Sequence, residues 1–406
     1  MRKYRLWQIA VFLLLIFLVA LPPHRVNAFQ YFHYWRVTFS GSIEVHGNES
    51  LPISSYWNYI GNRSWQTCEQ LSFNIVHNSE TIVPSELGED IDGNPRLSLD
   101  IGPLLEPNDT LQWEEEWLFT VSDRRPSLPQ ISIEQSGTLE EVESLLGTED
   151  YLRYTSGTML WKTWNQSLLD LAQVIQEGIP EESQNNILAL VHASIAWIQA
   201  NITRSTGITE PQYPEETVDS QMGDCDDQSN LLITLLRIHN IPCYLLTGHW
   251  FQNAARTHGY LWGSVEEDAY LYVDWQNSNG HGWAMVYVPP WGWLPFDLIA
   301  AGPGSDPIDT YYNSLYATGG PFVTLWQILA SDYIAERRTE KVELFAHQLH
   351  RVEEEVWHSF GSLPIIDNQY LTTNVATILA LTTTLILLTS LVVVAYRRQP
   401  EEDPEQ

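Results

Sequence analysis

The sequence predicts an α+β protein, and the order of its strand-like and helix-like stretches is the main evidence. Region 29–150 carries short runs of alternating polar and apolar residues, separated by Gly, Pro and Asn, which is typical of a β-sandwich. From about Leu139 apolar residues recur at helical spacing, and 248–297 is aromatic and strand-rich. We therefore expect a β-sandwich-like N-terminal domain over 29–150 and an α+β domain over 151–300.

The N-terminus has the pattern of a secretory signal peptide. Three basic residues in the first five positions precede an apolar stretch from Ile9 to Leu21, and Val26-Asn27-Ala28 supplies the small residues of a cleavage site. We expect residues 1–28 to be removed as a signal peptide. The alternative is an uncleaved anchor helix.

The C-terminus predicts a membrane anchor. The 22 residues from Val375 to Tyr396 include no charged side chain and would reach about 33 Å as a helix. Arg397 and Arg398 follow, which places the tail in the cytoplasm. We expect a transmembrane helix over 373–396, a cytoplasmic tail over 397–406, and a single-pass cell-membrane protein with an extracellular ectodomain. The preceding 301–372 predicts a helical stalk or juxtamembrane region.

Composition argues against nucleic-acid binding. The formal net charge is −31, from 20 Lys and Arg against 51 Asp and Glu, and such a surface repels phosphate backbones. Five tripeptides fit the N-glycosylation pattern, and all fall in the part predicted to lie outside the cell. They begin at Asn48, Asn62, Asn108, Asn165 and Asn201. We therefore expect an extracellular glycoprotein.

Three cysteines are too few for a disulfide-dense secreted scaffold, so a hydrophobic core must hold the fold. We expect Cys68 and Cys243 to be unpaired, with Cys243 buried in a strand. Cys225 lies two residues after Gly223 at the start of a strongly apolar helix, where backbone N–H groups favour a thiolate.

The residues beside Cys225 oppose thiolate formation. Asp224, Asp226 and Asp227 are carboxylates that raise a thiol pKa, and an exposed helix terminus contributes only about 0.3–1 kcal/mol. A catalytic Cys225 therefore needs an imidazole from elsewhere in the fold. The alternative is that Cys225 is a small buried hydrophobic residue.

Two histidines could supply that imidazole. His258 precedes Asp274 by 274 − 258 = 16 residues, and His281 precedes Asp297 by 297 − 281 = 16 residues. In both cases the two residues could lie on adjacent antiparallel strands, with the carboxylate orienting the imidazole. Spacing alone leaves both pairs open. His249 and His258 have no metal-binding motif around them, so we expect no metal and no cofactor.

From about Ile187 to Asp297 the sequence resembles the transglutaminase-like superfamily. The residues that carry the resemblance are Trp197, Ile202-Thr203, Glu216-Thr217-Val218, Gly223-Asp-Cys225-Asp-Asp227, Leu236-Arg237, Ile241-Pro242, His281-Gly-Trp283 and Trp291-Gly-Trp293-Leu-Pro-Phe-Asp297. The resemblance implies a papain-like α+β fold with Cys225 as nucleophile, His281 as base and Asp297 as orienting residue. It also selects the second His–Asp pair. Asn240, Cys243 and Gly282 depart from the usual pattern of the family.

The resemblance implies a thiol enzyme that attacks amide or peptide carbonyls, by hydrolysis or transamidation. Together with the two termini, it leads us to expect an extracellular, membrane-anchored form of such an enzyme. Its expected partners are protein or peptide substrates at the cell envelope and the membrane itself, through the C-terminal helix. The alternative is a non-catalytic envelope-binding module on the same scaffold.

Overall fold

The computed structural model describes residues 31–122, 130–205, 210–301, 311 and 322–364. The chain divides into two compact units, and the fold described below belongs to the unit Gln30–Leu363. The predicted signal peptide and the predicted transmembrane helix lie outside the described residues. Within the described part of the chain, no helix combines the length and the apolar character that a membrane span requires.

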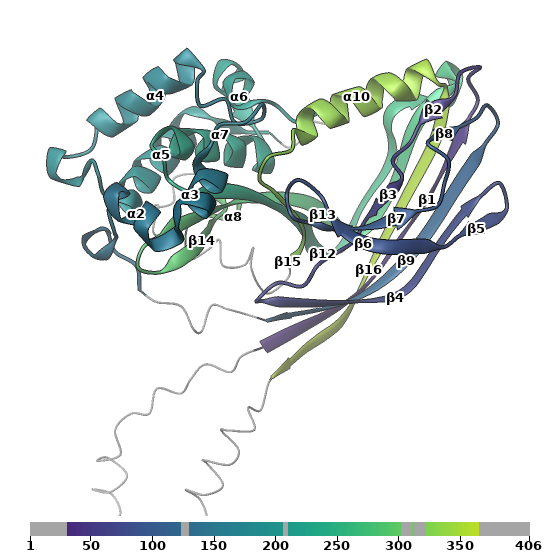
Figure 1. The fold of residues 1–406 in the computed structure, drawn as a ribbon, viewed down its shortest axis with the longest axis horizontal. Coiled ribbons are helices and arrows are strands. Elements are labelled where there is room, and N and C mark those ends of the chain that lie inside the picture. The colour runs from purple at the N-terminus through teal and green to yellow at the C-terminus, as the bar shows by residue number, and fades with distance from the viewer. Residues whose placement is uncertain (1–30, 123–129, 206–209, 302–310, 312–321, 365–406) are drawn as a thin grey trace, which may run out of the picture. The chain divides into compact units, whose positions relative to one another are not determined.

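A large mixed sheet dominates the described residues (Figure 1). Its nine strands follow the order β15-β12-β13-β16-β1-β9-β4-β5, and β14 pairs with β13 beside this path. Their bounds are β1 (Tyr31–Val45), β4 (Gln66–His77), β5 (Glu80–Ile82), β9 (Thr110–Ser122), β12 (Cys243–Ser264), β13 (Ala269–Val288), β14 (Gly292–Phe296), β15 (Phe322–Ile328) and β16 (Leu349–Pro364).

The long hairpin of β12 and β13 joins the two halves of this sheet. The strands have 22 and 20 residues, and their register pairs Cys243 with Val286 at one end and Ser264 with Ala269 at the other. Near the first end β13 pairs with β14 and β12 with β15, whereas near the turn β13 pairs in parallel with β16. The strands of 29–150 therefore share one sheet with the core, and they do not form a separate β-sandwich.

Small sheets cover part of one face of the large sheet. Side chains from β2, β7 and β8 join a hydrophobic cluster with residues of β4, β9 and β13, among them Ile75, Leu111 and Leu271. The short strands are β2 (Leu51–Pro52) with β8 (Leu104–Leu105), and β3 (Tyr56–Asn58) with β7 (Pro95–Leu99) and β6 (Pro84–Glu89). A further parallel pair is β10 (Thr203–Arg204) with β11 (Met222–Gly223).

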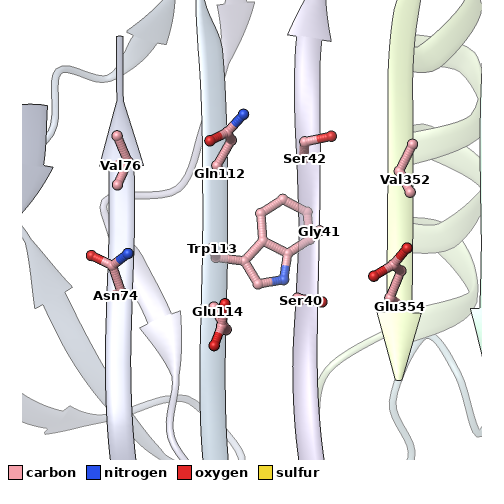
Figure 2. A pocket seen from close by; sticks show the side chains of 10 residues that line it. All are labelled: Ser40, Gly41, Ser42, Asn74, Val76, Gln112, Trp113, Glu114, Val352 and Glu354. Carbon is pink, nitrogen blue, oxygen red and sulfur yellow. The ribbon is translucent and has the colours of Figure 1, made fainter. Parts of the chain in front are cut away.

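The opposite, outer face of the sheet holds a shallow groove of about 330 Å³ over β4, β9, β1 and β16 (Figure 2). Ser40, Gly41 and Ser42 on β1 are small, so they leave a trough between the longer side chains of Glu114 and Glu354. The groove includes none of the site residues that the sequence predicts.

Most of the helices gather at the β14 end of the long hairpin (Figure 1). They are α2 (Leu139–Leu146), α3 (Thr148–Thr155), α4 (Gln166–Glu177), α5 (Ile187–Asn201), α6 (Pro214–Ser220), α7 (Cys225–Ile238) and α8 (Leu298–Ala301), with short 3₁₀ turns at Ile133–Gln135, Glu181–Ser183 and Val265–Glu267.

Helix α7 is the centre of this group. Every residue from Asp227 to Arg237 is buried, because α7 packs against α4 and α5 as well as β12 and β13. The buried Arg237 guanidinium donates to the Cys243 carbonyl at 3.1 and 2.8 Å, which fixes the end of α7 to the start of β12. Asn240 ends this turn with φ 58°, as its place after the helix predicts.

Within the described residues 322–364, the prediction of a helical stalk over 301–372 is only partly right, because one helix is present but lies between two strands of the large sheet. These form β15, then α10 (Tyr333–Ala346), then β16. The charges of β16 suggested a solvated helix, but Glu355 is buried in the sheet, where it accepts a hydrogen bond from Ser278 Oγ at 2.6 Å. Buried carboxylates need such partners, and local sequence does not reveal them.

Candidate active site

Cys225 is the first residue of α7, as the sequence predicts. Asp224 precedes the helix as its N-cap, and its backbone N–H donates to Asp227 Oδ2 at 3.2 Å in a capping box. The thiol is half-buried at a helix N-terminus, where unpaired backbone N–H groups favour negative charge.

The carboxylates around Cys225 oppose that effect. Burial raises the pKa of the Cys225 thiol well above its usual value, and the charges of Asp226 and Asp224 raise it further. Asp226 Oδ1 lies 3.9 Å from the sulfur. A backbone hydrogen bond from Gly282 acts the other way and favours the thiolate, which lowers the pKa. The resting thiol is therefore protonated near neutral pH.

The same carboxylates also hold protons. Burial, together with the charge of Asp226, raises the pKa of Asp224 to about 9 and that of Asp227 to about 7. Asp227 Oδ1 accepts the backbone N–H of Gln212 at 2.7 Å, which attaches the segment before α6 to the start of α7. The first turn of α7 is thus a compact set of acidic groups that share protons.

His281 and Asp297 form a buried pair. His281 Nε2 lies 2.6 Å from Asp297 Oδ2, and the two side chains are 5% and 1% exposed. Asp297 directly follows β14, and its other oxygen accepts the Ile299 N–H at 3.0 Å. With one imidazole nitrogen and one carboxylate oxygen committed, the orientation of the His281 ring is restricted.

Aromatic rings surround the His281 imidazole. Trp283 stacks on it at a centroid distance of 5.8 Å, while Phe322 and Trp250 lie at 5.3 and 6.4 Å. Phe322 comes from β15, a strand that the sequence analysis did not anticipate. These rings limit the access of water to the His281–Asp297 pair and strengthen its electrostatic interaction.

Gly282 brings the start of α7 against β13. A Cβ placed on Gly282 would lie 3.0 Å from the Asp226 Cβ and 3.4 Å from the Asp226 Cα, so the helix approaches the strand because Gly282 has no side chain. Ser229 Oγ donates to the Cys225 carbonyl at 2.6 Å and lies 3.5 Å from the Gly282 carbonyl. The residue next to His281 is therefore in contact with the turn that carries Cys225.

The other His–Asp pair does not join this site. His258 and Asp274 are direct cross-strand partners, but Asp274 accepts two hydrogen bonds from Arg256, at 2.8 and 2.6 Å, and His258 is exposed. Asp274 and His281 are 281 − 274 = 7 residues apart on the same strand, about 23 Å at 3.3 Å per residue.

A hydrogen-bonded chain that the sequence analysis missed supports Asp226. The Tyr333 hydroxyl donates to Asp226 Oδ2 at 2.6 Å and accepts from Asn230 Nδ2 at 2.7 Å. Asn230 Oδ1 in turn accepts from the buried Trp161 Nε1 at 3.0 Å. Tyr333 begins α10, more than 100 residues after Asp226, so no local pattern could have indicated it.

The other two cysteines are free, as predicted. Cys243 is buried at the start of β12, and Cys68 is half-buried. His249, considered above as a metal ligand, forms an ion pair with the buried Glu355, with Nδ1 and Oε1 2.6 Å apart. Ligand atoms of Asp224, Cys225 and Asp226 lie within 4.8 Å of one another, but a protonated thiol is a poor metal ligand.

Comparison with known proteins agrees with this core. Residues 173–298 match the model of the transglutaminase-like superfamily. Over 95 residues the chain is 30% identical to the uncharacterized protein YebA of Bacillus subtilis (strain 168), a match that spans 22% of this chain and 12% of YebA.

Two crystal structures are also similar at low identity. A candidate cysteine protease from Cytophaga hutchinsonii is 14% identical with a TM-score of 0.43, covering 84% of this chain and 92% of that chain. The periplasmic domain of TgpA from Pseudomonas aeruginosa, bound to ethylmercury, is 13% identical with a TM-score of 0.28, covering 66% of this chain and 89% of that chain.

Proposed function

We propose that this chain, which belongs to the transglutaminase-like superfamily through its core at residues 173–298, is a thiol enzyme that attacks amide or peptide carbonyls. In this proposal Cys225 is the nucleophile, His281 the general base and Asp297 the residue that orients the imidazole. The observation that carries it is the buried 2.6 Å contact of His281 with Asp297, next to Gly282, which is in contact with the first turn of α7.

The proposed reaction begins with a neutral thiol, because burial and the charges of Asp226 and Asp224 raise the pKa of Cys225. His281 takes the thiol proton as the sulfur attacks the carbonyl carbon, and the carbonyl oxygen becomes an oxyanion. The tetrahedral intermediate then collapses, the C–N bond breaks, and the imidazolium gives its proton to the departing ammonia or amine. A thioester on Cys225 remains. Asp297 stabilises the imidazolium during these steps.

The acceptor that releases the thioester decides between two activities. Attack by water gives a peptidase or amidase, whereas attack by a lysine amine gives a crosslink. We propose hydrolysis, because transamidation needs a second path that admits an amine, and no such path is evident among the described residues. His281 acts as base again, this time on water.

The proposed location is the outer side of a membrane, with protein or peptide substrates at the cell envelope. It is supported by the apolar termini and by Arg397 and Arg398. Protease added to intact cells should remove 40–350 and leave the tail after Arg397 protected. Protection of the whole chain would contradict this topology.

The test of the activity uses the purified full-length chain and glutamine-containing peptides, with and without a primary amine. Mass spectrometry should detect peptide cleavage or glutamine deamidation, and Cys225→Ala should reduce the rate by at least about 10³-fold. Saturable peptide binding by both proteins without any turnover would instead establish the non-catalytic binding module.

A further inference from the structure

A cluster of two histidines and one glutamate lies where the end of β1 meets the start of β16. The ligand atoms of Glu44, His46 and His350 all lie within 4.8 Å of one another. His46 and His350 are 350 − 46 = 304 residues apart in the sequence, so the fold alone brings them together. We propose that Glu44, His46 and His350 form a binding site for one divalent transition-metal ion, and zinc is the ion used to test it.

The backbone holds the two histidines in a defined register. The His46 N–H donates to the Gln348 carbonyl at 3.2 Å, and the Gly47 N–H donates to the His347 carbonyl at 2.8 Å. A Cβ on Gly47 would lie 2.5 Å from that His347 oxygen, so this close approach requires glycine. The two strand ends that carry His46 and His350 are therefore fixed against each other.

The distances suit a small metal ion. His46 Nε2 and Glu44 Oε2 are 3.3 Å apart. The edge of a tetrahedron with metal–ligand bonds of about 2.1 Å is about 3.4 Å, so these two atoms already have the spacing of a zinc site. The rings of His46 and His350 lie 3.8 Å apart at 37°. Glu44 and His46 are exposed, so small side-chain rotations can direct all three ligand atoms to one point.

The surroundings of His350 are those of a metal ligand. A backbone hydrogen bond to Asp268 engages the ring, and Tyr270 stacks on it at 4.6 Å. Histidines that bind metals usually use one nitrogen for the metal and donate the other N–H to a carbonyl or carboxylate, which fixes the ring.

The ligand set favours zinc or a similar ion over calcium or magnesium. Imidazole binds first-row transition metals, whereas the hard cations prefer all-oxygen sites. Three protein ligands leave a fourth position for water or a partner group. The ion would join the end of β1 to the start of β16, strands at the two ends of the described chain, and so stabilise the folded sheet.

The experiment uses the full-length chain with Cys225→Ala as the parent, so that this thiol does not compete for the metal. Calorimetry with Zn²⁺ should show one site per chain. His46→Ala and His350→Ala should each weaken binding by at least about tenfold, the lower limit observed when only a partner of a metal ligand is removed. Co²⁺ should give the visible spectrum of a tetrahedral site without a sulfur charge-transfer band.

The matched control is His258→Ala, since His258 is exposed on the same sheet but lies outside the cluster. It should bind Zn²⁺ as the parent does. If a histidine variant fails to fold, Glu44→Gln provides the same test, because Zn²⁺ should raise the melting temperature of the parent and not that of Glu44→Gln. Absence of saturable binding by the parent, or equal weakening in His258→Ala, would overturn the proposal.

Discussion

Two His–Asp pairs with identical sequence spacing involve the β12–β13 hairpin, but their surroundings differ. In the pair nearer the β12–β13 turn, His258 is exposed and Asp274 forms an ion pair with Arg256. In the pair nearer β14, His281 and Asp297 are buried, with their nearest atoms 2.6 Å apart. His258 and Asp274 lie directly opposite each other on β12 and β13, whereas His281 and Asp297 connect β13 with the residue after β14. Spacing places a histidine near a carboxylate, but the surrounding strands decide whether the pair can act on a thiol.

Replacing the two histidines should give the largest contrast. His281→Ala removes the proposed base, and we expect turnover to fall by at least about 10³-fold. His258→Ala removes an exposed ring far from Cys225, and turnover should stay within about twofold of the wild type. Steady-state kinetics with a cleavable peptide measures both. Equal losses in the two variants would show that the hairpin acts as a whole and not through one pair.

Replacing Asp297 or Asp274 should give a smaller contrast in kcat than replacing the two histidines. Asp297→Asn keeps the size of the side chain but removes the charge that stabilises the imidazolium, so we expect a loss of about 10²- to 10⁴-fold in kcat. Asp274→Asn breaks an exposed ion pair with Arg256, and such pairs contribute only about 0–1 kcal/mol. Its kcat should be unchanged. A kcat for Asp297→Asn equal to that of the wild type would exclude the orienting role.

Two glycines on β13 offer a packing comparison. A Cβ on Gly282 would meet Asp226 at 3.0 Å, whereas a Cβ on Gly280 would have no atom within 4 Å. Gly282→Ala should therefore displace the first turn of α7 and reduce the free energy of unfolding by about 1–3 kcal/mol, the usual cost of overpacking. Gly280→Ala should change it little. Urea denaturation of both variants gives the two values.

The acidic groups should give effects on stability that depend on pH, with opposite signs at the two sites. Burial raises the folded-state pKa of Asp224 from 3.8 to about 9, so the stability linked to its proton is complete below about pH 4 and is lost as pH rises toward 9. Asp224→Asn should thus be more stable than the wild type at pH 8, with the difference vanishing in acid.

Asp274 titrates in the other direction. The hydrogen bonds from Arg256 lower its pKa, so its contribution is present above the unfolded-state pKa and is lost as pH falls through the lower folded-state value. Asp274→Asn should be slightly less stable than the wild type near neutral pH and equal to it in strong acid. Thermal melting across this pH range compares both aspartates. If the difference in melting temperature between wild type and variant changed with pH in the same direction for both aspartates, the assigned pKa shifts would be contradicted.

Local patterns predicted the elements around the proposed nucleophile, Cys225. The apolar spacing of α5 and α7, the helix start at Cys225 and the turn at Asn240 are all short-range features, and the structure has them. The strand after Pro242, with Cys243 buried in it, was also predictable. These elements depend on residues that are neighbours in the sequence.

Those local patterns did not predict contacts between segments that are distant in the sequence. Tyr333 contacts Asp226 only because α10 packs back against the core. The charged residues of β16 suggested a solvated helix, but β16 is a strand in which a buried charge has a partner, as Glu355 has in His249. The resemblance to a known family selected His281 over His258, whereas spacing treated them alike. The sequence was therefore a better guide to which candidate residues lie together than to the architecture around them.

The most direct test of the central claim is the rate at which iodoacetamide alkylates Cys225 in the folded full-length chain, followed across neutral and alkaline pH. Because burial and the nearby carboxylates raise the pKa of the Cys225 thiol, the rate should rise with pH. Near neutral pH, reaction should depend on the His281 imidazole. His281→Ala should slow neutral alkylation sharply, while His258→Ala should match the wild type. If His258→Ala abolishes the reaction and His281→Ala does not, then His258 serves Cys225 and the proposed assignment is wrong.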